Sequence, residues 1–125
     1  MADGRAPRAA ARTSTTAKGR AGEDLAVAHL ERQGYVVVAR NVRAGGGEID
    51  IIAREGTLVC FVEVRRRARV LDALVSVDAK KQRRLVRAAT AWLARQRELP
   101  RCRFDVAVVT PAGIELVRGA FEAAP

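Results

Sequence analysis

The sequence has few of the features that mark secreted, membrane-spanning or zinc-binding proteins. Its 125 residues include only two cysteines, Cys60 and Cys102, too few for a disulfide framework or a cysteine-rich zinc site. No run of about 18 apolar residues is present, which argues against a transmembrane helix, and the start of the chain lacks an apolar stretch of the signal-peptide type. We therefore expect a protein of the reducing cytoplasm that does not associate with membranes.

Aromatic residues and histidine are scarce as well. Aromatics make up 4% of the chain and hydrophobic residues 49%, so small and branched aliphatic side chains must fill most of the core. The single histidine, His29, excludes nuclease chemistry by a histidine pair. Walker and serine-elbow motifs are absent. The glycines at positions 45–47 precede no helix, so we expect a flexible turn there rather than a phosphate-binding loop.

Acidic residues are outnumbered, and the excess positive charge is unevenly distributed. The formal net charge is +9, and residues 65–103 contain thirteen Lys and Arg against three acids. Residues 1–20 contain five basic residues and one acid. Clusters of Lys and Arg bind polyanions by neutralising their phosphates, so a nucleic acid is the expected partner. Solvated helix faces that bind no phosphate are the alternative interpretation.

The spacing of apolar residues predicts one α/β domain over residues 18–122, after a disordered basic tail at residues 1–17. Helices are expected at 18–33 and 77–97, with Ser76 capping the second, and an irregular stretch before Ser76. Strands are expected at 35–43, 48–54, 58–66, 103–110 and 114–118. The order α-β-β-β-α-β-β favours one mixed sheet flanked by helices, its first three strands antiparallel neighbours.

Carboxylates stand in two strands that are otherwise apolar. Because side chains alternate along a strand, Asp50 shares a face with Glu48, and Glu63 shares a face with Arg65. A buried carboxylate normally protonates, forms an ion pair or binds a cation. Two of them on neighbouring strands could hold Mg²⁺ or Mn²⁺, which prefer oxygen ligands. An ion pair of Glu63 with Arg65 or Arg66 is the alternative.

The predicted helices repeat this anomaly, because each carries a polar residue on its apolar face. Glu23 lies on that face of the first helix and Gln82 on that of the second. The helix dipole offers an ordinary explanation for an acid such as Glu23 near a helix N-terminus. Lys81 lies at the border between the apolar and basic faces of the second helix. Phosphate contacts are expected from that basic face and the loop before it: Arg66, Arg67, Arg69, Lys80, Arg83, Arg84 and Arg87.

Six short segments between residues 19 and 110 together resemble a known family. They are G-R-A-G-E-D-L-A (19–26), L-E-R-Q-G-Y (30–35), G-E-I-D-I-I-A-R (47–54), F-V-E-V-R-R-R (61–67), K-Q (81–82) and R-F-D-V (103–106). The combination of G-E-I-D with F-V-E-V-R is the specific part. The chain resembles the YraN family, which belongs to the restriction-endonuclease-like PD-(D/E)xK superfamily and is related to archaeal Holliday-junction resolvases. The resemblance implies a restriction-endonuclease-like core.

Carried over by position, the resemblance implies a metal site. Asp50 and Glu63 would be the carboxylate ligands of Mg²⁺ or Mn²⁺, and Glu23 would be a helix-borne acid that reaches the metal directly or through water. The implied activity is hydrolysis of DNA phosphodiesters by a metal-dependent endonuclease. Kinship with resolvases suggests branched or junction DNA as the substrate class.

The chain departs from the superfamily pattern at one catalytic position. Arg65 stands where the superfamily has its catalytic lysine, and Gln82 matches a glutamine of the following helix. Arginine keeps its proton near neutral pH and cannot shuttle it, although it can neutralise charge on a phosphate. Lys81 is the nearest candidate to replace the missing lysine.

Two other functions stay open at this point. A catalytically inactive nucleic-acid-binding module that keeps the nuclease fold is favoured by Arg65, and a basic adaptor that binds an acidic protein is the third hypothesis. DNA is expected as partner in preference to RNA, and a homodimer is compatible with the sequence.

Overall fold

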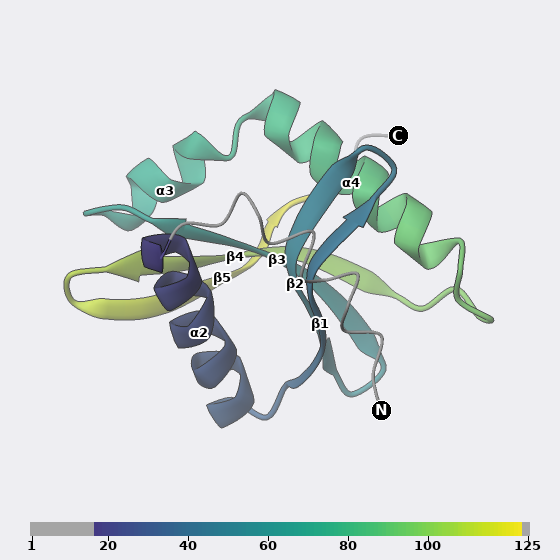
Figure 1. Cartoon of the computed structure of the whole chain (residues 1–125), viewed down its shortest axis with the longest axis horizontal. Helices are drawn as coiled ribbons and strands as arrows, with labels where there is room; N and C mark the ends of the chain where they lie inside the picture. The colour runs from purple at the N-terminus through teal and green to yellow at the C-terminus, as the bar shows by residue number, and fades with distance from the viewer. Residues whose placement is uncertain (1–16, 124–125) are drawn as a thin grey trace.

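The computed structural model describes residues 17–123 and places a central sheet between helices on both faces (Figure 1). The elements are α2 (Ala17–Arg32), β1 (Val36–Ala44), β2 (Gly47–Glu55), β3 (Leu58–Arg66), α3 (Val70–Ser76), α4 (Ala79–Leu93), β4 (Cys102–Thr110) and β5 (Gly113–Phe121). Strands follow one another in the sheet in chain order, and only β3 and β4 are parallel. The α/β class and the mixed sheet are confirmed, and the arrangement is compatible with a restriction-endonuclease-like core. The predicted basic tail lies outside the described residues, apart from its last position.

Alanines allow the helices to approach the sheet closely. On one face, Ala26 and Leu30 of α2 pack against Ile51 and Val62 of the sheet. On the other face, α4 contributes Ala88 and Ala89, and α3 contributes Ala73. All the aromatic residues except Tyr35 lie beside α4, where Trp92 meets Phe61 edge to face and the rings of Phe61, Phe104 and Phe121 stack in that order. None of the helices in the described part of the chain is both long enough and apolar enough to cross a membrane.

The segment before α4 differs from the prediction. A short helix, α3, replaces the expected irregular stretch, and it forms because Val70, Ala73 and Val77 can pack on the same hydrophobic cluster. Ser76 was predicted to cap α4, but its hydroxyl donates to the carbonyl of Ala73 instead. Asp78 caps the helix by accepting the backbone N–H of Lys81 at 2.9 Å. Helix α4 ends at Leu93, shorter than predicted.

A buried polar cluster joins β4, β5 and the start of β1. Asp105 is fully buried, and its two oxygens accept hydrogen bonds from Nε and Nη2 of Arg103 at 2.8 and 2.9 Å. One of them also accepts the backbone N–H of Gly119. The Tyr35 hydroxyl accepts from Arg103 and Arg118. Every oxygen of the Asp105 carboxylate is therefore paired, as a buried charge requires.

The β1–β2 turn presses against the backbone of α4. Gly45 and Gly46 both have positive φ, as the two-residue hairpin turn with matched strand twist requires. A Cβ on Gly45 would lie 2.8 Å from the carbonyl oxygen of Arg87, and one on Gly47 would lie 2.7 Å from that of Arg84. The glycines are therefore needed for close packing as well as for turning, and the turn is anchored to α4 rather than free.

Alanine at Gly45 should destabilise the protein more than alanine at Gly56. The two glycines have nearly equal φ angles of 57° and 59°, so each substitution incurs the same left-handed backbone cost of roughly 1–2 kcal/mol. Only Gly45 faces a backbone atom, whereas Gly56 faces open space. We expect Gly45→Ala to lower the free energy of unfolding by a further 1–3 kcal/mol, roughly, in urea titrations. Equal losses in the two variants would show that α4 moves aside without cost.

Candidate active site

The site forms where β2 and β3 separate. Backbone pairing between these strands stops at Ile51 and Val62. Beyond that point the Oδ2 atom of Asp50 accepts the backbone N–H of Val64 at 2.8 Å, so the side chain takes the place of a missing carbonyl partner. The alternation of β2 also breaks here, because Ile49 packs on the α4 side of the sheet and Ile51 on the α2 side.

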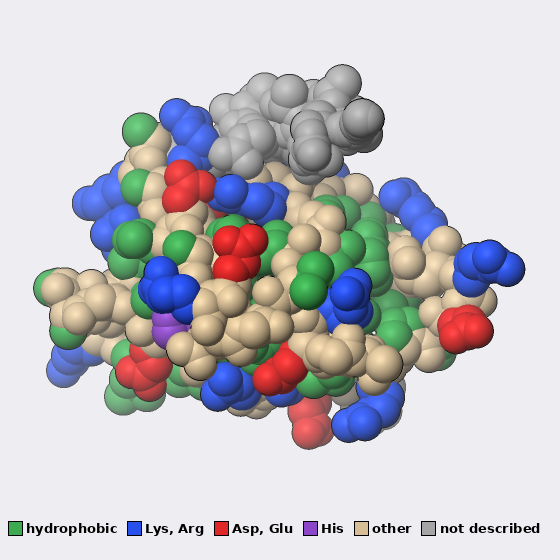
Figure 2. Space-filling view, turned by 90° about the horizontal axis from the view of Figure 1, so that it is seen from below, with side chains coloured by type: hydrophobic (Ala, Val, Ile, Leu, Met, Phe, Trp, Pro, Cys, Tyr) green, Lys and Arg blue, Asp and Glu red, His purple; other side chains and the backbone are tan. Residues whose placement is uncertain are grey.

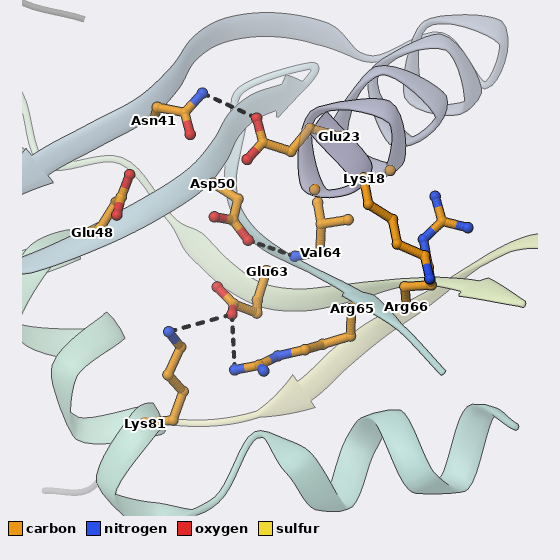
Figure 3. Close-up of a pocket in the computed structure, with 12 residues that line it drawn as sticks. Lys18, Glu23, Asn41, Glu48, Asp50, Glu63, Val64, Arg65, Arg66 and Lys81 are labelled. Atoms are coloured by element: carbon orange, nitrogen blue, oxygen red, sulfur yellow. Dashed lines mark hydrogen bonds and ion pairs between the residues drawn. The ribbon is translucent and has the colours of Figure 1, made fainter. Parts of the chain in front are cut away.

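A pocket of about 480 Å³ opens between the diverging strands, α2 and α4 (Figure 3). Its walls carry equal numbers of carboxylates and cations. The carboxylates are Glu23, Glu48, Asp50 and Glu63, and the cations are Lys18, Arg65, Arg66 and Lys81. The sequence-predicted residues Glu23, Asp50, Glu63, Arg65 and Lys81 are thus brought together from α2, β2, β3 and α4.

Glu63 is a buried carboxylate held by two cations. It is 5% exposed, and its Oε2 atom lies 3.1 Å from Nη2 of Arg65 and 3.5 Å from Nζ of Lys81. The predicted alternative of an ion pair is therefore present, with Arg65 rather than with Arg66. Nε of Arg65 is buried without a hydrogen-bond partner in the described part of the chain. The guanidinium thus keeps an unused donor inside the site.

Asp50 is held in an environment that disfavours its charge. Burial raises the pKa of this carboxyl well above its usual range, and the neighbouring charge of Glu63 raises the pKa further. The N–H of Val64 acts in the opposite direction, and the more distant charge of Glu23 adds to the increase. Figure 3 shows the Asp50 and Glu63 side chains next to one another in the pocket. A positive charge, either a bound proton or a cation, would therefore stabilise this carboxyl group.

Glu23 is tied to β1 on the other side of the pocket. It is 6% exposed, and its Oε1 atom accepts a hydrogen bond from Nδ2 of Asn41 at 3.0 Å. Nη2 of Arg40 lies 3.5 Å from the same atom and 2.7 Å from Oδ1 of Asp24. Arg40 thus bridges two acids of α2. This ion pair accounts for the burial of the Glu23 carboxylate without a bound metal ion.

Gln82 is the predicted site residue that lies apart from the others. Its Nε2 atom donates to the carbonyl of Val77 at 2.9 Å, which joins α4 to the end of α3. The side chain does not line the pocket. In this structure Gln82 therefore supports the position of α4, on which Lys81 lies.

The predicted phosphate contacts divide into three groups. Arg66 lines the pocket, and Arg84 lines a second hollow described below. Arg67 donates to the carbonyl of Arg66, and Arg69 is paired with Asp72 at 3.1 Å. The side chains of Lys80, Arg83 and Arg87 are exposed on α4.

A second hollow of about 390 Å³ adjoins the pocket, with Glu48 and Lys81 lining both. Its remaining walls come from the β1–β2 turn and α4, including Arg43 and Arg84. Neither of these arginines forms an ion pair with another residue of 17–123. The carboxylate pocket therefore continues into a groove with two available cations.

Sequence reasoning missed Asn41, Glu48 and Lys18 as parts of the pocket. Asn41 gave a usable signal, because it is an amide in a strand of valines, a position where asparagine is disfavoured. It is 1% exposed and has a φ of 52°, the only positive φ among the described residues other than glycine. Glu48 was recognised as sharing a face with Asp50 but was not assigned to the site.

The donor set suits a divalent cation bound partly through water. No group of three or more His, Cys, Asp or Glu side chains between residues 17 and 123 is arranged to hold a metal ion. Mg²⁺, however, usually takes only one or two protein carboxylates and keeps several waters. Asp50 and Glu63 supply such a pair, and the unpartnered Oδ1 atom of Asn41 leaves a further oxygen in the same pocket.

Known proteins confirm the family to which these residues point. Residues 22–109, which contain nearly the whole pocket, match the model of uncharacterised protein family UPF0102. A UPF0102 protein of Ralstonia pickettii is 50% identical over 86% of this chain and 91% of its own length. One of Cupriavidus metallidurans is 48% identical over 88% and 84%, and one of Geobacter metallireducens is 46% identical over 85% and 93%. The chain therefore belongs to the uncharacterised protein family UPF0102, the YraN family that its motifs resemble.

Proposed function

We propose that this protein is a Mg²⁺- or Mn²⁺-dependent endonuclease that hydrolyses phosphodiesters in DNA, including branched DNA. The observation that carries the proposal is the meeting of Asp50 and Glu63 at the point where β2 and β3 separate, beside a cationic groove. A family resemblance alone would leave these acids in unknown positions. Metal-dependent hydrolysis by these two carboxylates requires them to lie close enough to bind the same cation, and Asp50 and Glu63 line the same pocket.

Asp50 and Glu63 would hold the cation, which when bound lowers the pKa of water and offsets negative charge on the scissile phosphate. Asp50 is well suited, because burial and the neighbouring charge of Glu63 raise the pKa of its carboxyl, and a bound cation would offset both effects. Glu63 already has two positive neighbours, Arg65 and Lys81. If the Glu63 carboxylate bound the cation, the side chains of Arg65 and Lys81 would be free to contact a phosphate.

Arg65 and Lys81 would then share the two functions of the superfamily's catalytic lysine, which are charge stabilisation and proton transfer. Arg65 can stabilise the charge that develops on the phosphate through its planar, delocalised guanidinium. The Lys81 side chain is two-thirds buried, at 34% exposure, and lysine is a residue type that can serve in proton transfer, which arginine cannot. Both side chains reach the same oxygen of Glu63, so they approach the reaction centre from β3 and α4 together.

The groove gives DNA a path to the carboxylates. Arg43 and Arg84 lie along it on the turn side, and Lys18 and Arg66 line the pocket near the start of α2. On the side of the molecule away from α4, seen from below in Figure 2, the described acidic and basic side chains are interspersed. We therefore place the phosphate backbone on the α4 side.

Removing either carboxylate should abolish cleavage while leaving binding intact. We expect Asp50→Asn and Glu63→Gln to reduce Mn²⁺-dependent cleavage of junction, duplex and single-stranded DNA by more than about 100-fold, since loss of ligand-supporting groups alone costs 10–100-fold. Affinity for DNA in EDTA should stay the same or rise, because a negative charge is removed beside the phosphates. If wild-type protein binds DNA but cleaves none of these with either metal, the protein is a binding module instead.

Arg43 and Arg84 should contribute directly to DNA affinity. We expect the double variant Arg43→Ala/Arg84→Ala to bind more weakly and to lower the slope of log affinity against log salt by about 2, one for each phosphate that is no longer neutralised. The matched control is Arg95→Ala/Arg97→Ala, two exposed arginines beyond the far end of α4. Identical slopes for the two double variants would contradict the assignment of the groove. An absence of salt-dependent DNA binding would favour a protein adaptor.

Asp50 should make the metal-free protein less stable as pH rises. A carboxyl whose pKa is raised by folding contributes stability below its ordinary value of 3.8 and loses it as pH rises through the higher folded value. Asp50→Asn can still accept from Val64 but carries no charge. The stability difference in favour of the variant should therefore grow above that pH, by at most about 1.4 kcal/mol per pH unit. Urea unfolding in EDTA at several pH values measures it, and a pH-independent difference would contradict the prediction.

A further inference from the structure

We propose that Asn41 completes the cation site by supplying a third protein oxygen, its Oδ1 atom. This inference rests on the proposed function, because it assigns a further residue to the same metal site. Asn41 lies on β1 between two pairs of the β1–β2 ladder, Arg40 with Ile51 and Val42 with Ile49. The residue at the corresponding position of β2 is Asp50, so β1 delivers Asn41 to the same point of the sheet.

The orientation of the Asn41 amide is fixed by its partner. A carboxylate can only accept hydrogen bonds, so the Asn41 atom that faces Glu23 is the donor Nδ2, at 3.0 Å from Oε1. Oδ1 consequently points the other way, toward the part of the pocket where Figure 3 shows Glu48 and Asp50. The hydrogen bond to Glu23 therefore decides which atom of the Asn41 amide is Nδ2 and which is Oδ1.

Two local costs at Asn41 are not offset within the described chain. Oδ1 is buried and has no hydrogen-bond partner there, which typically costs about 1–3 kcal/mol. The backbone is in the left-handed region at a φ of 52°, a conformation that asparagine tolerates better than most residues but that still carries strain. Glycine would avoid both costs, although it would also remove the Nδ2 donor that Asn41 gives to Glu23. A ligand of Oδ1 would offset both costs.

The neutral charge of the amide suits the site. Asp50 already feels repulsion from Glu63 and Glu23, so another carboxylate would raise the cost of the empty site. An amide oxygen adds a ligand for a hard cation without adding charge. Through Nδ2 the same side chain also links the cation to Glu23, which gives that acid a role one step away from the metal.

The test is the affinity of the full chain for Mn²⁺ alone, measured by electron paramagnetic resonance without DNA. Asn41→Gly keeps the left-handed backbone and removes Oδ1, and we expect it to weaken Mn²⁺ binding by about 10-fold or more. Asn41→Asp keeps an oxygen at the same place and should bind Mn²⁺ at least as tightly as wild type, although it loses the hydrogen bond to Glu23. The control is Glu23→Gln, which preserves Oδ1 and should lose less affinity than Asn41→Gly.

The outcomes separate this inference from the proposed function. If wild type binds Mn²⁺ and Asn41→Gly binds it within about twofold, Asn41 has only a structural role and the inference is wrong while the cation site stands. If wild type binds no Mn²⁺, the metal-dependent function itself fails, and the inference falls with it. Circular dichroism of each variant establishes folding. Should Asn41→Gly not fold, weaker Mn²⁺ binding by Asn41→Asp than by wild type would overturn the proposal.

Discussion

The hydrogen bond from the Val64 backbone to Asp50 is the interaction on which the rest of the site depends. Where β2 leaves β3, the N–H of Val64 loses its strand partner and would be unsatisfied beside the core. A carboxylate is the strongest acceptor available for it. One side chain therefore bridges the gap between β2 and β3 and also lines the pocket.

Charge balance within the pocket follows from that arrangement. The two buried glutamates of the pocket each form ion pairs. Glu23 pairs with Arg40, and Glu63 pairs with Arg65 and Lys81. Asp50 has only a backbone dipole. Any divalent cation that enters must compete with Arg65 and Lys81 for Glu63, whereas at Asp50 it competes only with a proton. A negatively charged substrate would lower the cost of binding the proposed cation, because its phosphates would accept the side chains of Arg65 and Lys81 that Glu63 releases.

Much of the fold was predictable from local pattern, and the exceptions have physical reasons. The five strands and both long helices follow from apolar periodicity, and Glu23, Asp50 and Glu63 stood out as charges on apolar faces. The helix α3 was missed because seven residues with β-branched valines give little helical signal before packing is considered. Asp78 was overlooked as a cap in favour of Ser76, two residues earlier in the chain. Period-two reasoning could not foresee the break of alternation at Asp50, where the side chain accepts the N–H of Val64 on a neighbouring strand.

The packing of the glycine turn against α4 has a consequence for recognition. With the carbonyls of Arg84 and Arg87 pressed against Gly47 and Gly45, the helix can neither rotate nor slide without disrupting the hairpin. The backbone anchors of Lys81 and Arg84 are therefore fixed relative to Arg43 on the hairpin itself. A polyanion in this groove, as proposed, would meet cationic residues whose backbone positions are already set, so mainly side-chain entropy would be lost on association. The groove should then favour ligands in which the distance between phosphates matches the spacing of these residues.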